Sequence, residues 1–207
     1  MTSLYQTFSM FGDQIQLKQK INSNEFVDWT ESNFEYVRYN PRKDINRWGL
    51  SLTSLHGGLD GVPDLDSLRE YNKENNTKIR ESDFSVQTPV MEHPGIKEMV
   101  APWENDIFRS HVLKLGPGGF FPPHRDIYQQ YPESFRLIAP LKNTSQGSYF
   151  ILGEKILHWD VGSLYYINTA KSHTLFNATM RPSYWLVLNV GLNPKSVDNV
   201  LKNFAQI

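Results

Sequence analysis

Two residues with metal-binding side chains lie close together in the segment GFFPPHRDIYQQ, residues 119–130. His124 and Asp126 are separated by one residue and follow two consecutive prolines. Proline favours extended backbone at its own position and at the residue before it. In an extended chain alternate side chains point to the same face, so His124 and Asp126 are predicted to converge while Arg125 points away. An imidazole beside a carboxylate indicates a metal site that needs a third ligand.

His173 is the candidate for that third ligand. It opens a predicted strand over 172–178 and follows the turn NTAKS. Two histidines and one carboxylate on one side of a metal are typical of non-heme Fe(II) oxygenases, because they leave positions open for a cosubstrate and O2. A His-x-Asp pair by itself is a weak signal. The other histidines fit structural roles in loops (His56, His93) or in strand patterns (His111, His158).

Short strand patterns dominate the chain from residue 108 onward. Each is aromatic or β-branched and is separated from the next by Gly, Pro, Asn or Ser. They read FRSHVLKL, SFRLIAPLK, GSYFILG, KILHWDV, SLYYINTA, SHTLFNA and SYWLVLNVGL. Short strands at this spacing predict a β-sandwich or a β-barrel.

The first half of the chain has a mixed pattern. Helices are predicted over 13–22 and 64–76, and a short helix over 93–103. Short strands are predicted in FEYVRYN and RWGLSLTSL. We therefore expect a single domain over 1–207 of α+β class, mainly β, in which residues 1–107 brace a β core at 108–192.

The composition excludes several classes of function. The chain has 21 basic and 22 acidic residues and a net charge of −1, with no basic stripe, which argues against binding to nucleic acid or to a membrane surface. There are no cysteines, so thiolate chemistry and disulfides are excluded. The N-terminus does not have the pattern of a secretory signal, and no apolar run reaches the ~18 residues of a membrane span. We expect a cytoplasmic protein.

Several strings together resemble one enzyme family. They are LKLGPGGFFPPHRD, FRLIAPLKN, WDVGSLYYINTAKSHTLFN and YWLVLNV, which fall within residues 108–192. They are similar to the aspartyl/asparaginyl β-hydroxylase-like branch of the 2-oxoglutarate/Fe(II)-dependent oxygenases, which includes bacterial proline hydroxylases. The matching positions are Leu115, Pro117, Gly118, Pro123, His124, Arg136, Pro140, Leu141 and Gly162.

The resemblance implies a fold, a metal site and a reaction. The fold would be a double-stranded β-helix (a jelly-roll, cupin-like barrel) with iron at its open end. His124, Asp126 and His173 would bind Fe(II), with 2-oxoglutarate and O2 as cosubstrates, and an unactivated C–H bond would be hydroxylated. Asp126 agrees with the proline-hydroxylase members, whereas the animal aspartyl hydroxylases lack this carboxylate.

One motif departs from the family. An arginine that holds the far carboxylate of 2-oxoglutarate usually lies ten residues after the distal histidine, and that position is Ser183 here. Arg181 lies two residues earlier, a shift that preserves the strand face, so Arg181 is the predicted anchor with Ser183 as an added hydroxyl. Arg136 is the second candidate for contact with the cosubstrate. The histidine that often follows it by two residues is Ile138.

The sequence leaves the substrate and two other readings open. A small amino acid or a peptide side chain is the expected substrate, and Arg47 and Arg109 are possible partners for a substrate carboxylate. A cupin-like metal protein or isomerase would share the barrel without 2-oxoglutarate and would typically add a fourth protein ligand, from His111 or His158. A non-enzymatic jelly-roll binding module would explain the strands but not a buried Asp126.

Overall fold

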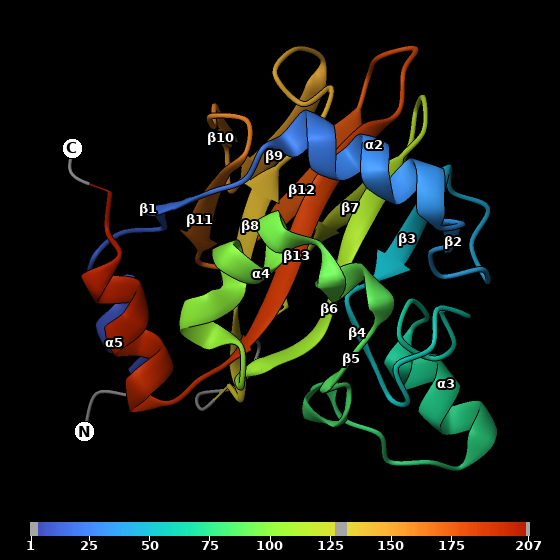
Figure 1. Ribbon diagram of the computed structural model, residues 1–207, viewed down its shortest axis with the longest axis horizontal. Coiled ribbons are helices and arrows are strands. Elements are labelled where there is room, and N and C mark those ends of the chain that lie inside the picture. The colour runs from blue at the N-terminus through green and yellow to red at the C-terminus, as the bar shows by residue number, and fades with distance from the viewer. Residues whose placement is uncertain (1–3, 127–131, 206–207) are drawn as a thin grey trace.

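Two antiparallel β-sheets form the centre of the protein, whose computed structural model describes residues 4–126 and 132–205 (Figure 1). The large sheet has seven strands in the order β1-β11-β8-β13-β6-β3-β2, the small sheet has four in the order β10-β9-β12-β7, and β4 and β5 form a separate pair. The strands are β1 (Gln14–Lys20), β2 (Val37–Arg38), β3 (Arg47–Ser51), β4 (Thr53–Ser54), β5 (Val86–Gln87), β6 (Ile107–Leu115), β7 (Phe120–His124), β8 (Ser134–Pro140), β9 (Ser148–Leu152), β10 (Lys155–Leu157), β11 (Ser163–Ile167), β12 (His173–Asn177) and β13 (Ser183–Gly191).

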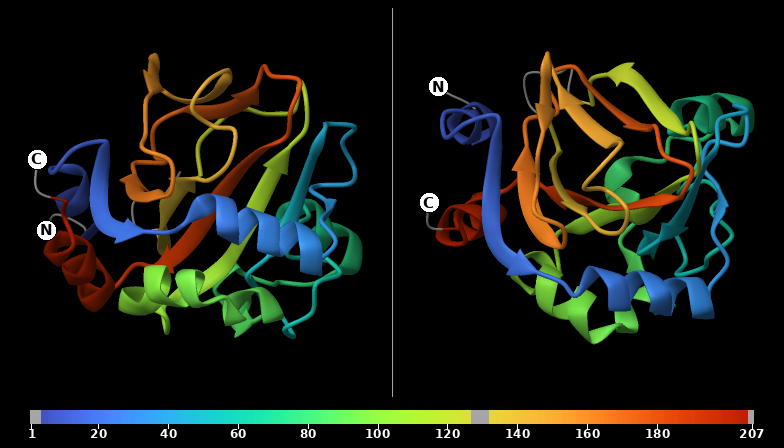
Figure 2. Two further views of the ribbon diagram at one scale, coloured as in Figure 1. Left: turned by 45° about the horizontal axis from the view of Figure 1, so that its top comes forward. Right: turned by 90° about the horizontal axis from the view of Figure 1, so that it is seen from above.

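Helices cover the face of the large sheet that points away from the small sheet. Figure 2 shows α2 and α4 lying across this face, while α1 and α5 lie together at the end near β1. The helices are α1 (Leu4–Ser9), α2 (Ser23–Asn33), α3 (Leu68–Asn75), α4 (Pro94–Val100) and α5 (Pro194–Lys202), with short 3-10 turns at Glu81–Asp83, Pro89–Glu92 and Ala101–Trp103. In the described part of the chain, none of these helices has the length and apolar character needed to cross a membrane.

The large sheet separates two hydrophobic clusters. Along β13, Leu186 and Leu188 belong to the cluster beneath the helices, whereas Trp185 belongs to the cluster between the two sheets. This alternation follows from the two-residue period of a strand. The cluster between the sheets consists of Leu113, Leu115, Ile138, Phe150, Leu152, Ile167, Leu175 and Trp185. Side chains on the inner face of the large sheet therefore line the space in which a site can form.

The strands predicted after residue 108 are confirmed. Each of the seven segments contains a strand, namely β6 and β8 to β13, and His173 is the first residue of β12 as expected. The eighth strand of this half, β7, lies in the segment that was expected only to be extended. The helices predicted over 64–76 and 93–103 are present as α3 and α4. Turn residues mark the ends of these strands and helices, so the elements could be located from the local sequence.

The helix predicted over 13–22 is wrong, because this segment forms β1. Its glutamines and lysines favour a helix, but Ile15 and Leu17 alternate with polar residues, and Leu17 is fully buried. The segment pairs antiparallel with β11 over Gln14–Gln16 and again at Lys20. Pairing with a distant strand outweighs the small differences in helix propensity. The two longest helices of the described residues, α2 with 11 residues and α5 with 9, lie in segments where no helix was predicted.

Candidate metal centre

His124 and His173 face each other across the small sheet. His124 ends β7, His173 begins β12, and the two residues are paired in the antiparallel register. Their ring centroids lie 4.3 Å apart. Two prolines keep β7 out of a helix, because each lacks the backbone N–H that a helix needs and disfavours helical backbone at the residue before it. The last residue of one strand and the first residue of its neighbour therefore reach the same end of the barrel.

Backbone carbonyls orient both imidazoles. Nδ1 of His124 lies 2.8 Å from the carbonyl oxygen of Pro122, and Nδ1 of His173 lies 3.1 Å from that of Lys171. Since a carbonyl only accepts, each Nδ1 carries the proton and each Nε2 keeps a lone pair. Nε2 of His124 is 3.5 Å from Oδ1 of Asp126, and Nε2 of His173 is 3.8 Å from Oδ2.

The three side chains fit a metal ion. One ligand atom from each of His124, Asp126 and His173 can be chosen so that all lie within 4.8 Å of one another. Among the described residues, no other histidine, aspartate or glutamate joins this group. Two neutral imidazoles and one carboxylate are the donor set of non-heme Fe(II) sites, and hydrogen bonds from the distal ring nitrogens are what metal-bound histidines usually have.

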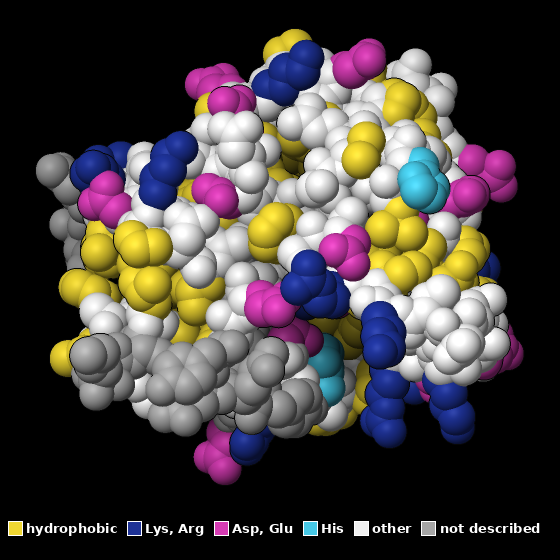
Figure 3. Space-filling model, turned by 90° about the horizontal axis from the view of Figure 1, so that it is seen from below, with side chains coloured by type: hydrophobic (Ala, Val, Ile, Leu, Met, Phe, Trp, Pro, Cys, Tyr) yellow, Lys and Arg dark blue, Asp and Glu magenta, His cyan; other side chains and the backbone are white. Residues whose placement is uncertain are grey.

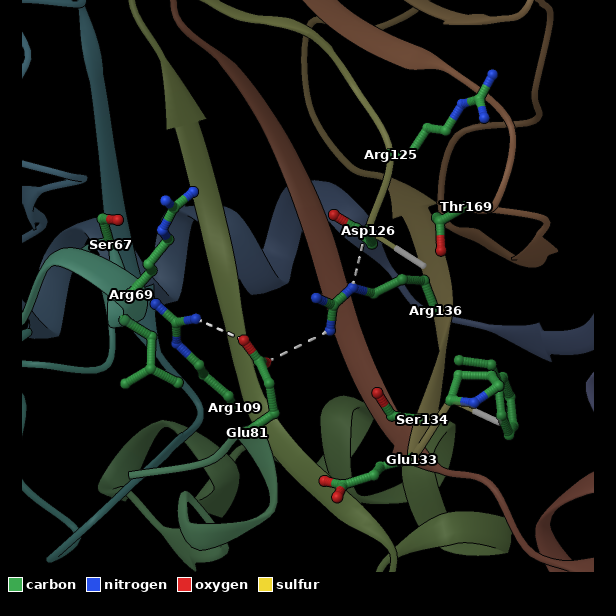
Figure 4. Close-up of a pocket in the computed structure, with 13 residues that line it drawn as sticks. Ser67, Arg69, Glu81, Arg109, Arg125, Asp126, Glu133, Ser134, Arg136 and Thr169 are labelled. Atoms are coloured by element: carbon green, nitrogen blue, oxygen red, sulfur yellow. Dashed lines mark hydrogen bonds and ion pairs between the residues drawn. The ribbon is translucent and has the colours of Figure 1, made fainter. Parts of the chain in front are cut away.

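A chain of alternating charges leads away from Asp126. Nε of Arg136 donates to Oδ2 of Asp126 over 3.1 Å, and Nη1 of Arg136 is 3.8 Å from Oε2 of Glu81. Arg109 donates to the other oxygen of Glu81 over 2.7 Å. Figure 4 shows these four side chains in a row, with Arg125 pointing away from Asp126. The row comes from β6, β8, the turn at Glu81 and the chain just after β7.

These charges set the protonation of the site. Asp126 is more exposed than expected from the sequence, with 24% of its side chain accessible. Its partial burial would raise its pKa, but Arg136 and the two histidines outweigh this and hold that pKa well below its usual range. Burial likewise opposes the charge on Arg136, yet Asp126 and Glu81 raise its pKa. For His173 burial prevails and lowers the pKa, whereas for His124 the contact with Asp126 outweighs burial and raises it. An ionised Asp126 between two imidazoles favours a cation at this site.

A small cavity opens from the triad into the space between the sheets. Its volume is about 90 Å³, and apart from the triad and Arg136 it is lined by Tyr39, His111, Leu113, Phe121, Ile138, Phe150, Leu175 and Val187. His111 is buried, and Nδ1 of its ring has no hydrogen-bond partner. Burial lowers the pKa of His111 to about 3, so its imidazole is neutral. The cavity is thus mainly apolar, with its charges gathered at the triad.

A larger and more polar pocket lies on the other side of the Asp126–Arg136 pair. Its volume is about 490 Å³. It is lined by Ser67, Leu68, Arg69, Glu81, Arg109, Arg125, Asp126, Pro132, Glu133, Ser134, Phe135, Arg136 and Thr169. Figure 3 shows basic and acidic side chains side by side on this face of the molecule, close to a histidine. Asp126 and Arg136 therefore border both the apolar cavity and an open polar pocket.

The residues predicted to hold a cosubstrate are not gathered in one place. Arg136 lies at the triad, but its guanidinium is already paired with two carboxylates. Ser183 is fully buried and accepts a hydrogen bond from the Ser148 hydroxyl over 2.9 Å. Arg181 is exposed in the loop between β12 and β13. Neither Arg181 nor Ser183 lines either of these two spaces.

Sequence reasoning missed Glu81. This glutamate starts a 3-10 turn in the segment RESDF and pairs with both Arg109 and Arg136. Nothing in its local sequence marks it, because the two arginines that it joins belong to distant strands. The one available signal was an acidic residue that could pair with an arginine of a predicted strand. Many acidic residues meet that description, so the signal could not identify Glu81.

No model of a protein family and no curated protein matches this chain. Among solved structures, an oxidoreductase of the 2OG-Fe(II) oxygenase family from Burkholderia pseudomallei aligns over 90% of this chain and 89% of its own, with a TM-score of 0.52 and 10% identity. A prolyl-4-hydroxylase from Pseudomonas putida aligns over 92% and 99%, with a TM-score of 0.51 and 10% identity. A predicted oxalate decarboxylase from Thermotoga maritima aligns over 45% of this chain and 74% of its own, with a TM-score of 0.34 and 17% identity.

The two long alignments establish the fold. They span nearly the whole chain, and the sheets and their antiparallel pairing agree with a double-stranded β-helix. The predicted class, mainly β with a jelly-roll barrel braced by helices, is confirmed.

Proposed function

We propose that the protein is a 2-oxoglutarate- and Fe(II)-dependent oxygenase that hydroxylates a C–H bond of a small amino acid or a peptide side chain. The observation that carries this proposal is the convergence of Nε2 of His124, Nε2 of His173 and the carboxylate of Asp126 at the mouth of a cavity between the sheets. The match of its strand motifs to the aspartyl/asparaginyl and proline hydroxylase-like branch supports placing it there.

Each side chain of the site has a distinct part in this proposal. His124, Asp126 and His173 hold the metal, which with 2-oxoglutarate and O2 supplies the oxidising chemistry when bound. Arg136 fixes the orientation of the Asp126 carboxylate and keeps it ionised. The apolar walls of the cavity keep water away from the reacting atoms. The polar pocket on the other side of Asp126 is where we place the substrate.

The absence of a fourth ligand separates this proposal from the cupin-like alternative. His111 lines the cavity but does not join the group of ligand atoms, and His158 is exposed after β10. Within the described residues the site therefore offers three protein donors, which suits a metal that must also bind a bidentate cosubstrate and O2. A cupin-like protein does not bind 2-oxoglutarate and would not need as many metal coordination positions free of protein ligands.

Succinate formation tests the proposal. Protein loaded with Fe(II) under anaerobic conditions is mixed with 2-oxoglutarate, O2 and a panel of free amino acids and short peptides, and succinate is followed by NMR. We expect a basal rate that one class of substrate stimulates, together with a substrate product heavier by one oxygen. Asp126→Ala should abolish succinate formation, whereas Asp44→Ala, at an exposed surface ion pair, should not. Wild-type turnover in Asp126→Ala would refute the assignment.

A further inference from the structure

Arg47 is a buried arginine without an acidic partner. It is the first residue of β3 and is 3% exposed. Its guanidinium carbon lies 4.3 Å from the ring centroid of Phe121 and 5.3 Å from that of Tyr39. Its Nη1 donates to the carbonyl oxygen of Phe120 over 3.4 Å, while its Nε has no hydrogen-bond partner. Among the described residues, no acidic side chain pairs with it.

This charge is held at a cost to the fold. Burial without a counter-ion disfavours a guanidinium, and burial accordingly lowers the pKa of Arg47. The faces of Phe121 and Tyr39 offset only part of that cost. Two other arginines near the site do have an acidic partner, since Arg109 and Arg136 both pair with Glu81. A bound anion would supply the counter-ion that the buried Arg47 guanidinium lacks.

The register of the sheet directs Arg47 into the barrel. Arg47 is paired with Leu115 on β6, and Leu115 is paired with Ser183 on β13. Directly paired residues of antiparallel strands point to the same face. Because Leu115 belongs to the cluster between the sheets, Arg47 and Ser183 also face that space. The contact with Phe120 shows that the Arg47 side chain reaches across from the large sheet to β7 of the small sheet.

Arg47 lies directly behind the wall of the cavity that contains the triad. Tyr39 and Phe121, the two rings against which its guanidinium packs, both line that cavity. The Phe121 ring centroid is in turn 6.2 Å from that of His124. A single aromatic ring thus contacts both the buried cation and a predicted metal ligand.

We propose that Arg47 binds the carboxylate of 2-oxoglutarate that lies away from the metal. This inference rests on the proposed function, and it moves the anchor from Arg181, in an exposed loop, to β3, which lies outside residues 108–192 that carry the main motifs of the resemblance. The ligand class is a 2-oxo acid with a second carboxylate, chelated at the triad and ion-paired at β3. Arg47 can form a bidentate pair with that carboxylate, which a lysine could not.

A comparison of two 2-oxo acids isolates the anchor. Pyruvate has the same chelating end as 2-oxoglutarate but lacks the second carboxylate. Each acid is titrated anaerobically into Fe(II)-loaded protein, and binding is followed by the visible charge-transfer absorption. The variants are Arg47→Met, Arg181→Met and, as a matched control, Arg38→Met, an arginine of the neighbouring strand that also packs on an aromatic ring but pairs with Asp44 at the surface.

We expect wild-type protein to prefer 2-oxoglutarate over pyruvate, and Arg47→Met to lose affinity for 2-oxoglutarate by about 10- to 100-fold while its affinity for pyruvate is unchanged. Arg181→Met and Arg38→Met should keep the preference. Iron content and circular dichroism of each variant verify that the triad and the fold are intact. If Arg47→Met does not fold, the ratio of the two affinities in Arg47→Lys gives the same comparison, with an intermediate loss expected.

The possible outcomes distinguish failure of the Arg47 assignment from failure of the proposed oxygenase function. Loss of the preference in Arg181→Met but not in Arg47→Met would overturn this inference and leave the proposed function standing. A wild-type protein that binds both acids equally has no anchor, which would also overturn it. A protein that holds iron but binds neither acid would refute the proposed function itself.

Discussion

The guanidinium of Arg136 holds the carboxylate of Asp126, with Nε donating to Oδ2 over 3.1 Å. The same guanidinium lies 3.8 Å from Glu81, so it stays in place through contacts on both sides. Asp126 follows the end of β7, where its backbone N–H donates to the carbonyl oxygen of Thr169 over 3.0 Å, whereas Arg136 lies within β8. The backbone of Asp126 is thus held by Thr169, while the orientation of its carboxylate depends on an arginine of a different sheet.

Replacement of Arg136 should weaken metal binding without removing any ligand. We expect Arg136→Met to reduce Fe(II) affinity about 10- to 100-fold, the range seen when partners of metal ligands are changed. Competition with a chromophoric chelator under anaerobic conditions measures this affinity. Arg38→Met serves as the control, since Arg38 pairs with Asp44 at the surface. Equal Fe(II) affinities in the two variants would show that Arg136 does not contribute to metal binding by Asp126.

Removal of His173 should abolish stable iron binding. His173→Ala leaves one imidazole and one carboxylate, which cannot hold three positions of the metal. Iron retained after gel filtration, measured by atomic emission, should fall from stoichiometric to background. His158→Ala is the matched control because His158 is exposed and lies outside the group of ligand atoms. Unchanged iron content in His173→Ala would exclude the triad.

His111 should make the fold less stable in acid. Its pKa is about 3 in the folded protein against 6.5 when unperturbed. Between these values the unfolded chain binds a proton that the folded chain does not, so the stability contributed by neutral His111 is present above pH 6.5 and falls as the pH is lowered toward 3. The slope should be about 1.4 kcal/mol per pH unit.

Urea denaturation at several pH values between 7 and 4 measures this slope. The variant His111→Leu removes the titrating group from the apolar cavity wall, and its stability should depend less steeply on pH than that of the wild-type protein. His158→Ala, at an exposed histidine, should keep the wild-type slope. A slope that is the same in His111→Leu and in wild type would assign the acid sensitivity to other groups.

The strand β1 should contribute to stability through Leu17. This side chain is fully buried in the cluster beneath the helices, and Leu17→Ala should lower the free energy of unfolding by about 2–5 kcal/mol. Lys20→Ala, at an exposed position of the same strand, should change it by about 0.5 kcal/mol or less. Chemical denaturation of the two variants makes the comparison. Equal small effects would contradict a buried, paired β1.

The strands of the second half could be predicted from the sequence because their signals are local. Turn residues separate short runs of aromatic and β-branched side chains, and each run became a strand of the barrel. The convergence of His124 and Asp126 could be predicted from their spacing, but the strand that was expected to carry both ends at His124, and Asp126 lies in the bend that follows. The start of β12 at His173 follows from the turn that precedes it.

Only the tertiary structure decided which distant side chains meet. Residues 13–22 have helix-forming side chains and an alternating pattern at once, and pairing with β11 made them a strand. The two-residue rule for Arg181 applies only inside a strand, and Arg181 precedes the first residue of β13. The partners of Arg136 and the lack of an acidic partner for Arg47 depend on elements far apart in the chain. Local propensity contains no information about such contacts, because their free energy arises only when the sheets close around the site.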